Sequence, residues 1–256
     1  MTTTATNLNK KPSNLRALLV IALICLVCFL GVALSRGYFT TLNASVNQWA
    51  VGIQTGGLTQ IATFIADRFD TTFLLAVTVP VFCLLVCMRQ FNGGVLLAGA
   101  MGLDAVLLQV AKTVVISPRP LNSIVIESDY SFPSGHVTST IVFFGTLTYL
   151  AWQNRSRIVK ACFGLLTPTL AIFVGFTRLY LNAHWLSDVL AAPFLAVFVI
   201  AASILILQQL TRWYIKRKFQ GALGGTDSPL NLRVQGLNGG ANTRSVLHSI
   251  FRGRKQ

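Results

Sequence analysis

Six apolar runs dominate this chain, and each is near the length that a helix needs to cross a bilayer. The runs span about 17–35, 71–88, 94–116, 133–152, 159–176 and 185–211. About 20 helical residues cross the hydrocarbon core, and a helix satisfies its own backbone hydrogen bonds there. The sequence therefore predicts an all-α fold, a polytopic membrane helix bundle with six transmembrane helices.

The composition also favours a membrane protein. Of the 256 residues, 53% are hydrophobic and only 11% are charged, whereas a soluble domain carries about 25% charged residues. The formal charge of +14 could suggest a nucleic-acid partner, but the basic residues cluster in loops and tails between the apolar runs. Because this distribution is typical of membrane orientation and of contact with anionic headgroups, we expect no nucleic-acid partner.

The segments outside the apolar runs flank or interrupt a predicted membrane domain at 17–211. Residues 1–16 are polar and are predicted to form an N-terminal tail. Residues 36–70 have apolar residues at helical spacing, which favours one or two short interfacial helices outside the cytoplasm. Residues 212–256 are basic and are predicted to form a largely disordered tail, either solvated or bound to anionic lipids.

Lysine and arginine are unequally shared between the two sides of the predicted bundle. With the N-terminus inside, the inner segments carry sixteen of these residues and the outer segments carry five. Cytoplasmic loops carry an excess of Lys and Arg. We therefore expect an integral protein of the inner or plasma membrane with both termini in the cytoplasm.

Three polar strings lie at the predicted outer ends of the apolar runs. They read KTVVISPRP at 112–120, PSGH at 133–136 and TRLYLNAHWLSD at 177–188. Ionisable groups at such places are energetically costly, so they are functional candidates by default. Cations that can hold an anion, together with two imidazoles and a carboxylate, suggest an enzyme that acts on phosphate.

These strings resemble the tripartite signature of the type 2 phosphatidic acid phosphatase (PAP2) superfamily. The matching residues are Lys112, Arg119 and Pro120, then Pro133, Ser134, Gly135 and His136, then Arg178, His184 and Asp188. Thr177 replaces the serine of the family pattern and keeps a hydroxyl. The resemblance covers about 95–200 and implies a metal-independent phosphatase of the family's membrane branch, which has six spans.

The resemblance also implies the roles of the catalytic residues. His184 would attack phosphorus and form a phosphohistidine, and His136 would act as the general acid and then activate water. His184 and Asp188 are four residues apart, so on a helix that begins near Asn182 they would share one face. The carboxylate could then fix the tautomer of the imidazole.

The second string also suggests how a phosphate would be held. Pro133 suits the first turn of a helix, where the next three backbone N–H groups would be free to bind an anion. Fixed positive charge from the other two strings would stabilise the phosphate oxygens. The predicted substrate-binding residues are Lys112, Arg119, Ser134, Gly135 and Arg178.

The acidic residues outside this signature are few. All seven Asp and Glu are spread along the chain, so no cluster offers metal ligands, and we expect neither a metal nor a cofactor. Asp104 lies within an apolar run and needs a partner, for which a structural hydrogen bond is favoured over a proton path. Glu127 and Asp129 precede the second string and would either shape the site entrance or be solvated.

The predicted function is hydrolysis of a lipid phosphate or diphosphate at the outer membrane interface. Undecaprenyl diphosphate, phosphatidylglycerol phosphate and phosphatidate are the candidate substrates. One alternative is phosphotransfer from lipid to lipid, and another is a non-catalytic anion or lipid carrier, which would need no His–Asp pair beside a second His. Vanadate-dependent peroxidase chemistry occurs in a soluble branch of the superfamily, and the six apolar runs count against it.

Overall fold

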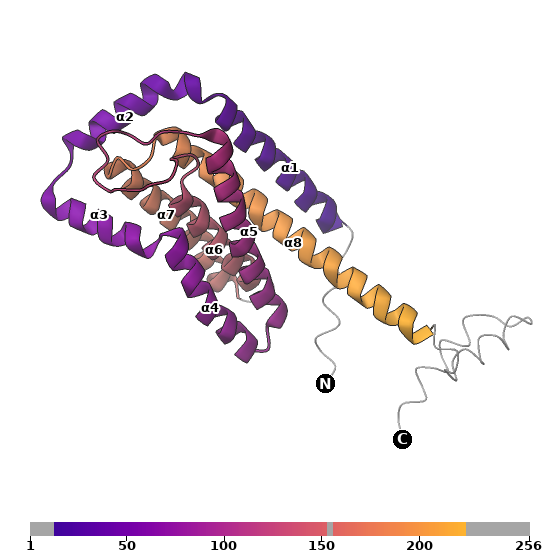
Figure 1. The fold of residues 1–256 in the computed structure, drawn as a ribbon. Helices are drawn as coiled ribbons and strands as arrows, with labels where there is room; N and C mark the ends of the chain where they lie inside the picture. The colour runs from indigo at the N-terminus through magenta and orange to yellow at the C-terminus, as the bar shows by residue number, and fades with distance from the viewer. Residues whose placement is uncertain (1–12, 153–155, 224–256) are drawn as a thin grey trace, which may run out of the picture. The chain divides into compact units, whose positions relative to one another are not determined.

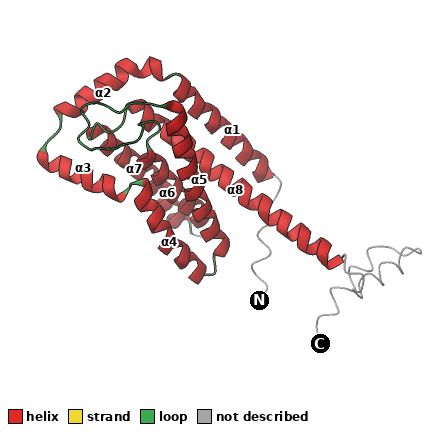
Figure 2. Cartoon of the chain, in the orientation of Figure 1, coloured by secondary structure: helices red, strands yellow, loops and turns green. Residues whose placement is uncertain are grey.

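The computed structural model describes residues 13–152 and 156–223, and these residues are helical apart from their connecting loops (Figures 1 and 2). Among them are eight α-helices and one 3₁₀ helix, with no strand, so the predicted all-α class is confirmed. The elements are α1 (Ser13–Leu34), η1 (Arg36–Phe39), α2 (Thr40–Gly52), α3 (Gly56–Arg68), α4 (Thr71–Cys87), α5 (Phe91–Val115), α6 (Gly135–Trp152), α7 (Arg157–Tyr180) and α8 (Leu186–Leu223).

Four of the described helices are long and apolar enough to cross a membrane by themselves. They are α1 over Leu15–Leu34, α5, α7 and α8 over Leu186–Ile215. Helices α3 and α4 pass the same test together, although they are bent by 50° at the break between them. The described residues thus offer four or five candidate spans, which makes this an integral membrane protein, and six spans remain a prediction.

Helix α6 is the expected span that does not meet this test, because polar residues lower its hydropathy. Every residue from Gly135 to Phe143 is buried, and the hydroxyl-bearing members of this stretch include Thr138, Ser139 and Thr140. These side chains face protein, since α6 packs against α4, α5 and α7. A helix surrounded by other helices can carry hydroxyls that lipid would not favour.

The helix bounds differ from the sequence prediction mainly at the ends. Helix α1 begins at Ser13, inside the predicted tail at 1–16, and α8 continues past 211 to Leu223. The predicted interfacial segment at 36–70 contains η1, α2 and α3. The structure does not describe residues 1–12 or 224–256. The second range contains the basic end of the tail that is predicted to bind lipids.

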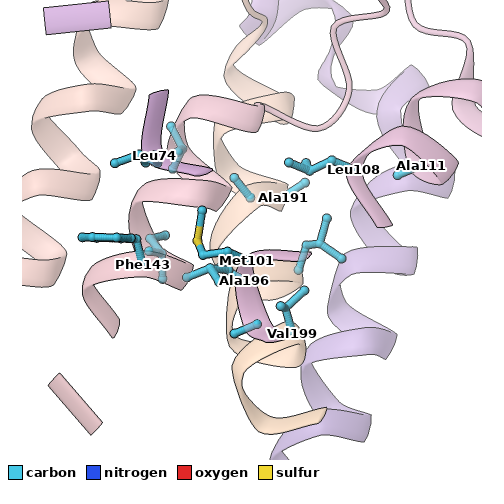
Figure 3. Packing of buried hydrophobic residues seen from close by; sticks show 14 of the residues in the cluster. Leu74, Met101, Leu108, Ala111, Phe143, Ala191, Ala196 and Val199 are labelled. Atoms are coloured by element: carbon cyan, nitrogen blue, oxygen red, sulfur yellow. The ribbon is translucent and has the colours of Figure 1, made fainter. Parts of the chain in front are cut away.

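Small side chains of α8 lie in the same hydrophobic core as residues of α5. Ala191 and Ala196 of α8 are fully buried, as is Met101 of α5. Met101 lies beside Ala196 in the centre of this packing, with Val199 nearby (Figure 3). In lipid, helices associate by close van der Waals contact, which small residues favour.

A buried polar network joins α4, α5 and α6 just beneath the functional end of the bundle. Ser139 Oγ donates to Asp104 Oδ2 at 2.6 Å, and Thr71 Oγ1 lies 2.9 Å from Ser139 Oγ. The structural hydrogen bond expected for Asp104 is therefore present. Thr71 Oγ1 would also lie 3.1 Å from a Cβ built on Gly135, so the network underlies the first residue of α6.

Four helix ends meet where the polar strings lie. The last turns of α5 and α7 and the first turns of α6 and α8 gather at the same end of the bundle, with the 116–134 loop across them (Figure 1). Helix α2 lies over the same end and contacts α7. This arrangement brings strings that are far apart in the sequence into one site.

Candidate active site

Direct contacts join the first polar string to the third. Arg119 Nη1 donates to the carbonyl of Ala183 at 2.7 Å and lies 3.3 Å from His184 Nε2. Trp185 adds a second contact between these two strings, because its Nε1 donates to the carbonyl of Pro118 at 2.8 Å. The loop after α5 is thus held against the turn that carries His184.

The second string contacts both of the others. Ser134 N donates to the backbone carbonyl of Asp188 at 3.2 Å. A Cβ built on Gly135 would lie 3.1 Å from Thr71 Oγ1 and 4.0 Å from Lys112 Nζ, so a larger residue would crowd Thr71 and would contact this ammonium group. The three strings therefore form one cluster, as the sequence predicted.

The turn that presents His184 is not helical, so the expected helix beginning near Asn182 is wrong. Asn182 has φ 52°, and its N–H donates to Leu179 O while Ala183 N donates to Arg178 O. These two bonds form a Schellman motif, in which Asn is one of the few residues that tolerates the left-handed position. The motif ends α7 and turns the chain back, which places His184 two residues before α8.

Two asparagines of α2 hold this turn in place. Asn43 Nδ2 donates to Ser187 Oγ at 3.1 Å, and Asn43 Oδ1 accepts from Ser187 N at 3.0 Å. One turn later, Asn47 Nδ2 donates to Asn182 Oδ1 at 2.8 Å, and Asn47 Oδ1 accepts from Asn122 at 2.9 Å. This role was not predicted from the sequence, although two asparagines four residues apart, and therefore on one face of a helix, were a usable signal.

Hydrogen bonds set the tautomer of His184. Its Nδ1 lies 2.8 Å from the carbonyl of Ser131, which can only accept, so Nδ1 carries the proton. Asp188 Oδ2 is farther, at 3.5 Å from Nδ1, and it accepts from Trp185 N at 2.9 Å. Nε2 therefore keeps its lone pair and faces Arg119. The predicted orienting role of the carboxylate falls mainly to a backbone carbonyl.

His184 is held neutral by its surroundings. Its side chain is almost completely buried, and burial lowers the pKa of His184 well below the ordinary value of 6.5. The positive charges of Arg178 and Arg119 lower this pKa further. The unprotonated ring is the form that can act as a nucleophile.

His136 lies in the first turn of α6, close to a carboxylate that the sequence analysis did not select. Its Nε2 is 3.7 Å from Asp70 Oδ1, and Asp70 caps α4 by accepting from Thr72 N at 2.8 Å. An aspartate directly before an apolar helix is an N-cap signature, which was the available signal. Asp70 partly offsets the burial and the charges of Arg178, Lys112 and Arg119 that oppose a proton on His136.

The start of α6 differs from the predicted anion cradle. Helix α6 begins at Gly135, so Pro133 precedes the helix, and the N–H of Ser134 is engaged by Asp188 rather than free. The Oγ of Ser134 is buried and has no hydrogen-bond partner within the described part of the chain. Ser134 can therefore offer its hydroxyl to a ligand but not its backbone N–H.

The three predicted cations are present, and each is paired with an acidic residue of the 116–134 loop. Arg178 contacts Glu127, and Lys112 contacts Asp129. Arg119 Nη2 lies 2.6 Å from Glu127 Oε2 and 2.5 Å from Asp129 Oδ1. The alternative in which these acidic residues are merely solvated is therefore wrong.

Comparison with known proteins agrees with this geometry. A family model described as PAP2 superfamily matches residues 93–212, which hold all three strings. Residues 93–212 belong to the PAP2 superfamily. Within the matched segment lie α5 to α7 and the first part of α8, and therefore both histidines and all three cations.

Individual PAP2 relatives extend the match beyond this segment. Phosphatidylglycerophosphatase B of Bacillus subtilis (strain 168) is 25% identical over 173 residues, which are 66% of this chain and 85% of the relative. An undecaprenyl-diphosphatase of Sulfolobus acidocaldarius is 30% identical over 140 residues, or 50% of this chain and 62% of the relative. A solved PAP2-type phosphatidylglycerolphosphate phosphatase from Bacillus subtilis is 22% identical with a TM-score of 0.61, covering 77% of this chain and 96% of its own. That likeness confirms the PAP2 fold.

The environment of His184 leads to a pH prediction. Because burial and the neighbouring arginines lower its pKa, we expect His184 to remain neutral at pH 6.5 and to gain a proton only as the pH falls further. ¹⁵N NMR of the histidine-labelled protein in detergent can follow this titration and identify the Nδ1–H tautomer. The chain has three histidines, so single replacements assign the signals. Titration at or above 6.5, or a proton on Nε2, would contradict this description of the site.

Proposed function

We propose that this chain is an integral membrane lipid phosphatase that hydrolyses a terminal phosphate through a phosphohistidine on His184. The observation that carries this proposal is the unprotonated Nε2 of His184, in a ring that Ser131 orients and 3.3 Å from Arg119 Nη1. Two PAP2 relatives are named as a phosphatidylglycerophosphatase and an undecaprenyl-diphosphatase, which supports phosphatase chemistry on lipids.

The first chemical step uses both histidines. The Nε2 lone pair of His184 attacks phosphorus, the bond from phosphorus to the leaving oxygen breaks, and protonated His136 donates its proton to that oxygen. The Nδ1–H of His184 keeps its bond to the Ser131 carbonyl, and Asp188 at 3.5 Å stabilises the positive charge that the ring acquires.

The second step releases phosphate and restores the enzyme. Neutral His136 takes a proton from water, the resulting hydroxide oxygen attacks phosphorus, and the bond from phosphorus to Nε2 breaks with its electron pair returning to His184. Inorganic phosphate leaves, and His136 is protonated for the next cycle. Asp70, 3.7 Å from His136 Nε2, partly offsets the burial and the nearby cations that oppose this proton.

The cations act on the phosphate oxygens in both steps. Charge spreads over the equatorial oxygens in the transition state, and positioned donors stabilise it without reorganising. Lys112, Arg119 and Arg178 supply fixed positive charge, and the space beside Gly135 lets an oxygen approach Lys112 Nζ. The Oγ of Ser134 is the remaining donor. The residues in this scheme need no metal or cofactor.

The substrate is proposed to be a lipid whose phosphate reaches the outer interface. Undecaprenyl diphosphate and phosphatidylglycerol phosphate are favoured over phosphatidate by the names of the relatives. A panel of lipid diphosphates, lipid monophosphates and soluble phosphate esters, read by released phosphate, distinguishes them. If phosphate appeared on an added lipid instead of in solution, the chain would be a lipid-to-lipid phosphotransferase. Exchange of lipid or anion across vesicles without any turnover would indicate a carrier.

The orientation is proposed from the charge distribution. Sixteen Lys and Arg fall in the segments predicted to be inner and five in those predicted to be outer. By the positive-inside rule both termini are cytoplasmic, and the ends of α5 and α7 that carry the site are extracytoplasmic. The basic residues after 211 are placed to meet anionic headgroups of the inner leaflet of the plasma or inner membrane.

Removal of the proposed nucleophile tests the chemistry. His184→Ala should lower phosphate release from a lipid diphosphate by at least about a thousandfold in detergent with EDTA present, because the covalent route is lost. The matched control is His248→Ala, which replaces a histidine outside the three strings and should keep wild-type turnover. Wild-type turnover in purified, folded His184→Ala would contradict the assignment. Loss of wild-type activity in EDTA would contradict the metal-independent scheme.

Cysteine labelling tests the orientation. Leu121 in the 116–134 loop is fully exposed, and Gln90 between α4 and α5 is exposed at the opposite end of these helices. In a chain whose five native cysteines are replaced, Leu121→Cys should react with an impermeant maleimide in intact cells. Gln90→Cys should react only after lysis. The reverse pattern would mean that the site faces the cytoplasm.

A further inference from the structure

Two loop carboxylates occupy the positive charges that the proposed reaction needs for phosphate. Glu127 bridges Arg178 and Arg119, and Asp129 bridges Lys112 and Arg119. All three cations of the polar strings are therefore paired with two carboxylates that lie two residues apart in the loop, which leaves one net positive charge. The two carboxylates together carry two negative charges, like the terminal phosphate of a monoester or diphosphate near neutral pH.

The three cations cannot bind the loop carboxylates and a phosphate fully at the same time. Nη2 of Arg119 is already within 2.6 Å of Glu127 and within 2.5 Å of Asp129. Arg178 is almost completely buried, yet its Nε has no hydrogen-bond partner among the described residues, so Glu127 does not satisfy the guanidinium completely. A terminal phosphate carries three oxygens on one atom, so a single anion can accept from donors of all three cations. The site thus has an internal anion and an incompletely used set of donors.

We propose that Glu127 and Asp129 are internal competitors for the phosphate site and determine which anions can enter it. A ligand must displace the carboxylates, so a terminal phosphate with about two negative charges enters more readily than a phosphodiester with one. Ordinary phospholipids at the interface are phosphodiesters, and the two carboxylates exclude them. This inference rests on the proposed function, because it takes the cations as the phosphate-binding groups.

The structure allows Asp129 to leave without unfolding the loop. Its side chain is 45% exposed, and rotation would bring the carboxylate into water. The backbone stays anchored, since Ser131 N donates to Ser117 O at 2.9 Å and Arg119 Nε donates to Asp129 O at 2.9 Å. Burial alone would raise the pKa of Asp129, but Lys112 and Arg119 lower it overall, so the competing group is ionised.

Glu127 is the less suitable residue for a first test. It is the ion-pair partner of Arg178, whose side chain is 1% exposed. Removing one partner of a buried ion pair leaves an uncompensated charge and destabilises the protein. Of the two cations that Asp129 contacts, Arg119 still donates to Ala183 O, and an asparagine at 129 keeps an oxygen that Lys112 can contact. Asp129→Asn therefore removes competition with the smaller risk to folding.

The test compares Asp129→Asn with the wild-type chain in detergent. We expect KM for a lipid phosphate and the inhibition constant of inorganic phosphate to fall by at least about fivefold, with kcat within about twofold. Inorganic phosphate should also raise the unfolding temperature of Asp129→Asn at concentrations that do not affect the wild type. The matched control is Asp67→Asn, which removes an exposed carboxylate of α3 that makes no ion pair within the described residues.

The outcomes separate this inference from the proposed function. If the wild type hydrolyses lipid phosphate but Asp129→Asn binds phosphate no more tightly, or loses kcat, the carboxylates position the cations and the inference is wrong. If no lipid phosphate is hydrolysed, the proposed function fails, and the thermal shift with inorganic phosphate still decides the inference. If Asp67→Asn bound phosphate more tightly by the same factor, the effect would come from net charge alone, and the inference would be wrong.

Discussion

The contacts of Arg119 hold the site together, because this side chain touches both the turn and the loop that complete it. It donates to the Ala183 carbonyl, lies 3.3 Å from His184 Nε2, and pairs with both loop carboxylates. The 116–134 loop is long and has no regular structure, so without such a contact it would not keep its cation near the histidine. Arginine suits this position because its fork of five donors can serve several acceptors at once.

The fold supports these contacts of Arg119 with a helix, α6, that carries several hydroxyl groups and packs against three other helices. Helix α6 begins at the site, and its hydroxyl residues are buried against other helices rather than exposed to lipid. Ser139 links α6 to Asp104 of α5 and to Thr71 of α4. These bonds connect the three helices beside Gly135, the first residue of α6. The stability of the bundle and the geometry of the site therefore depend on the same buried residues.

Much of this architecture could be predicted from the sequence, because long apolar runs and charged boundaries are local patterns. The runs locate the cores of α1, α4, α5, α6, α7 and α8, and the three strings do come together. The errors arose where a single residue or a distant contact decides the geometry. Asn182 takes a left-handed conformation and removes His184 from the helix. The hydrogen bond from Asn43 to Ser187 joins residues 144 positions apart in the sequence, and no local pattern reveals such a contact.

The central claim is that the strings form one phosphate site with His184 as its nucleophile. The most direct measurement is an experimental structure of the full chain with bound orthovanadate, which mimics the five-coordinate phosphorus of the transition state. The account predicts vanadium bonded to His184 Nε2, with its equatorial oxygens contacting Lys112, Arg119 and Arg178. Vanadate bonded to His136, or bound away from these cations, would contradict it.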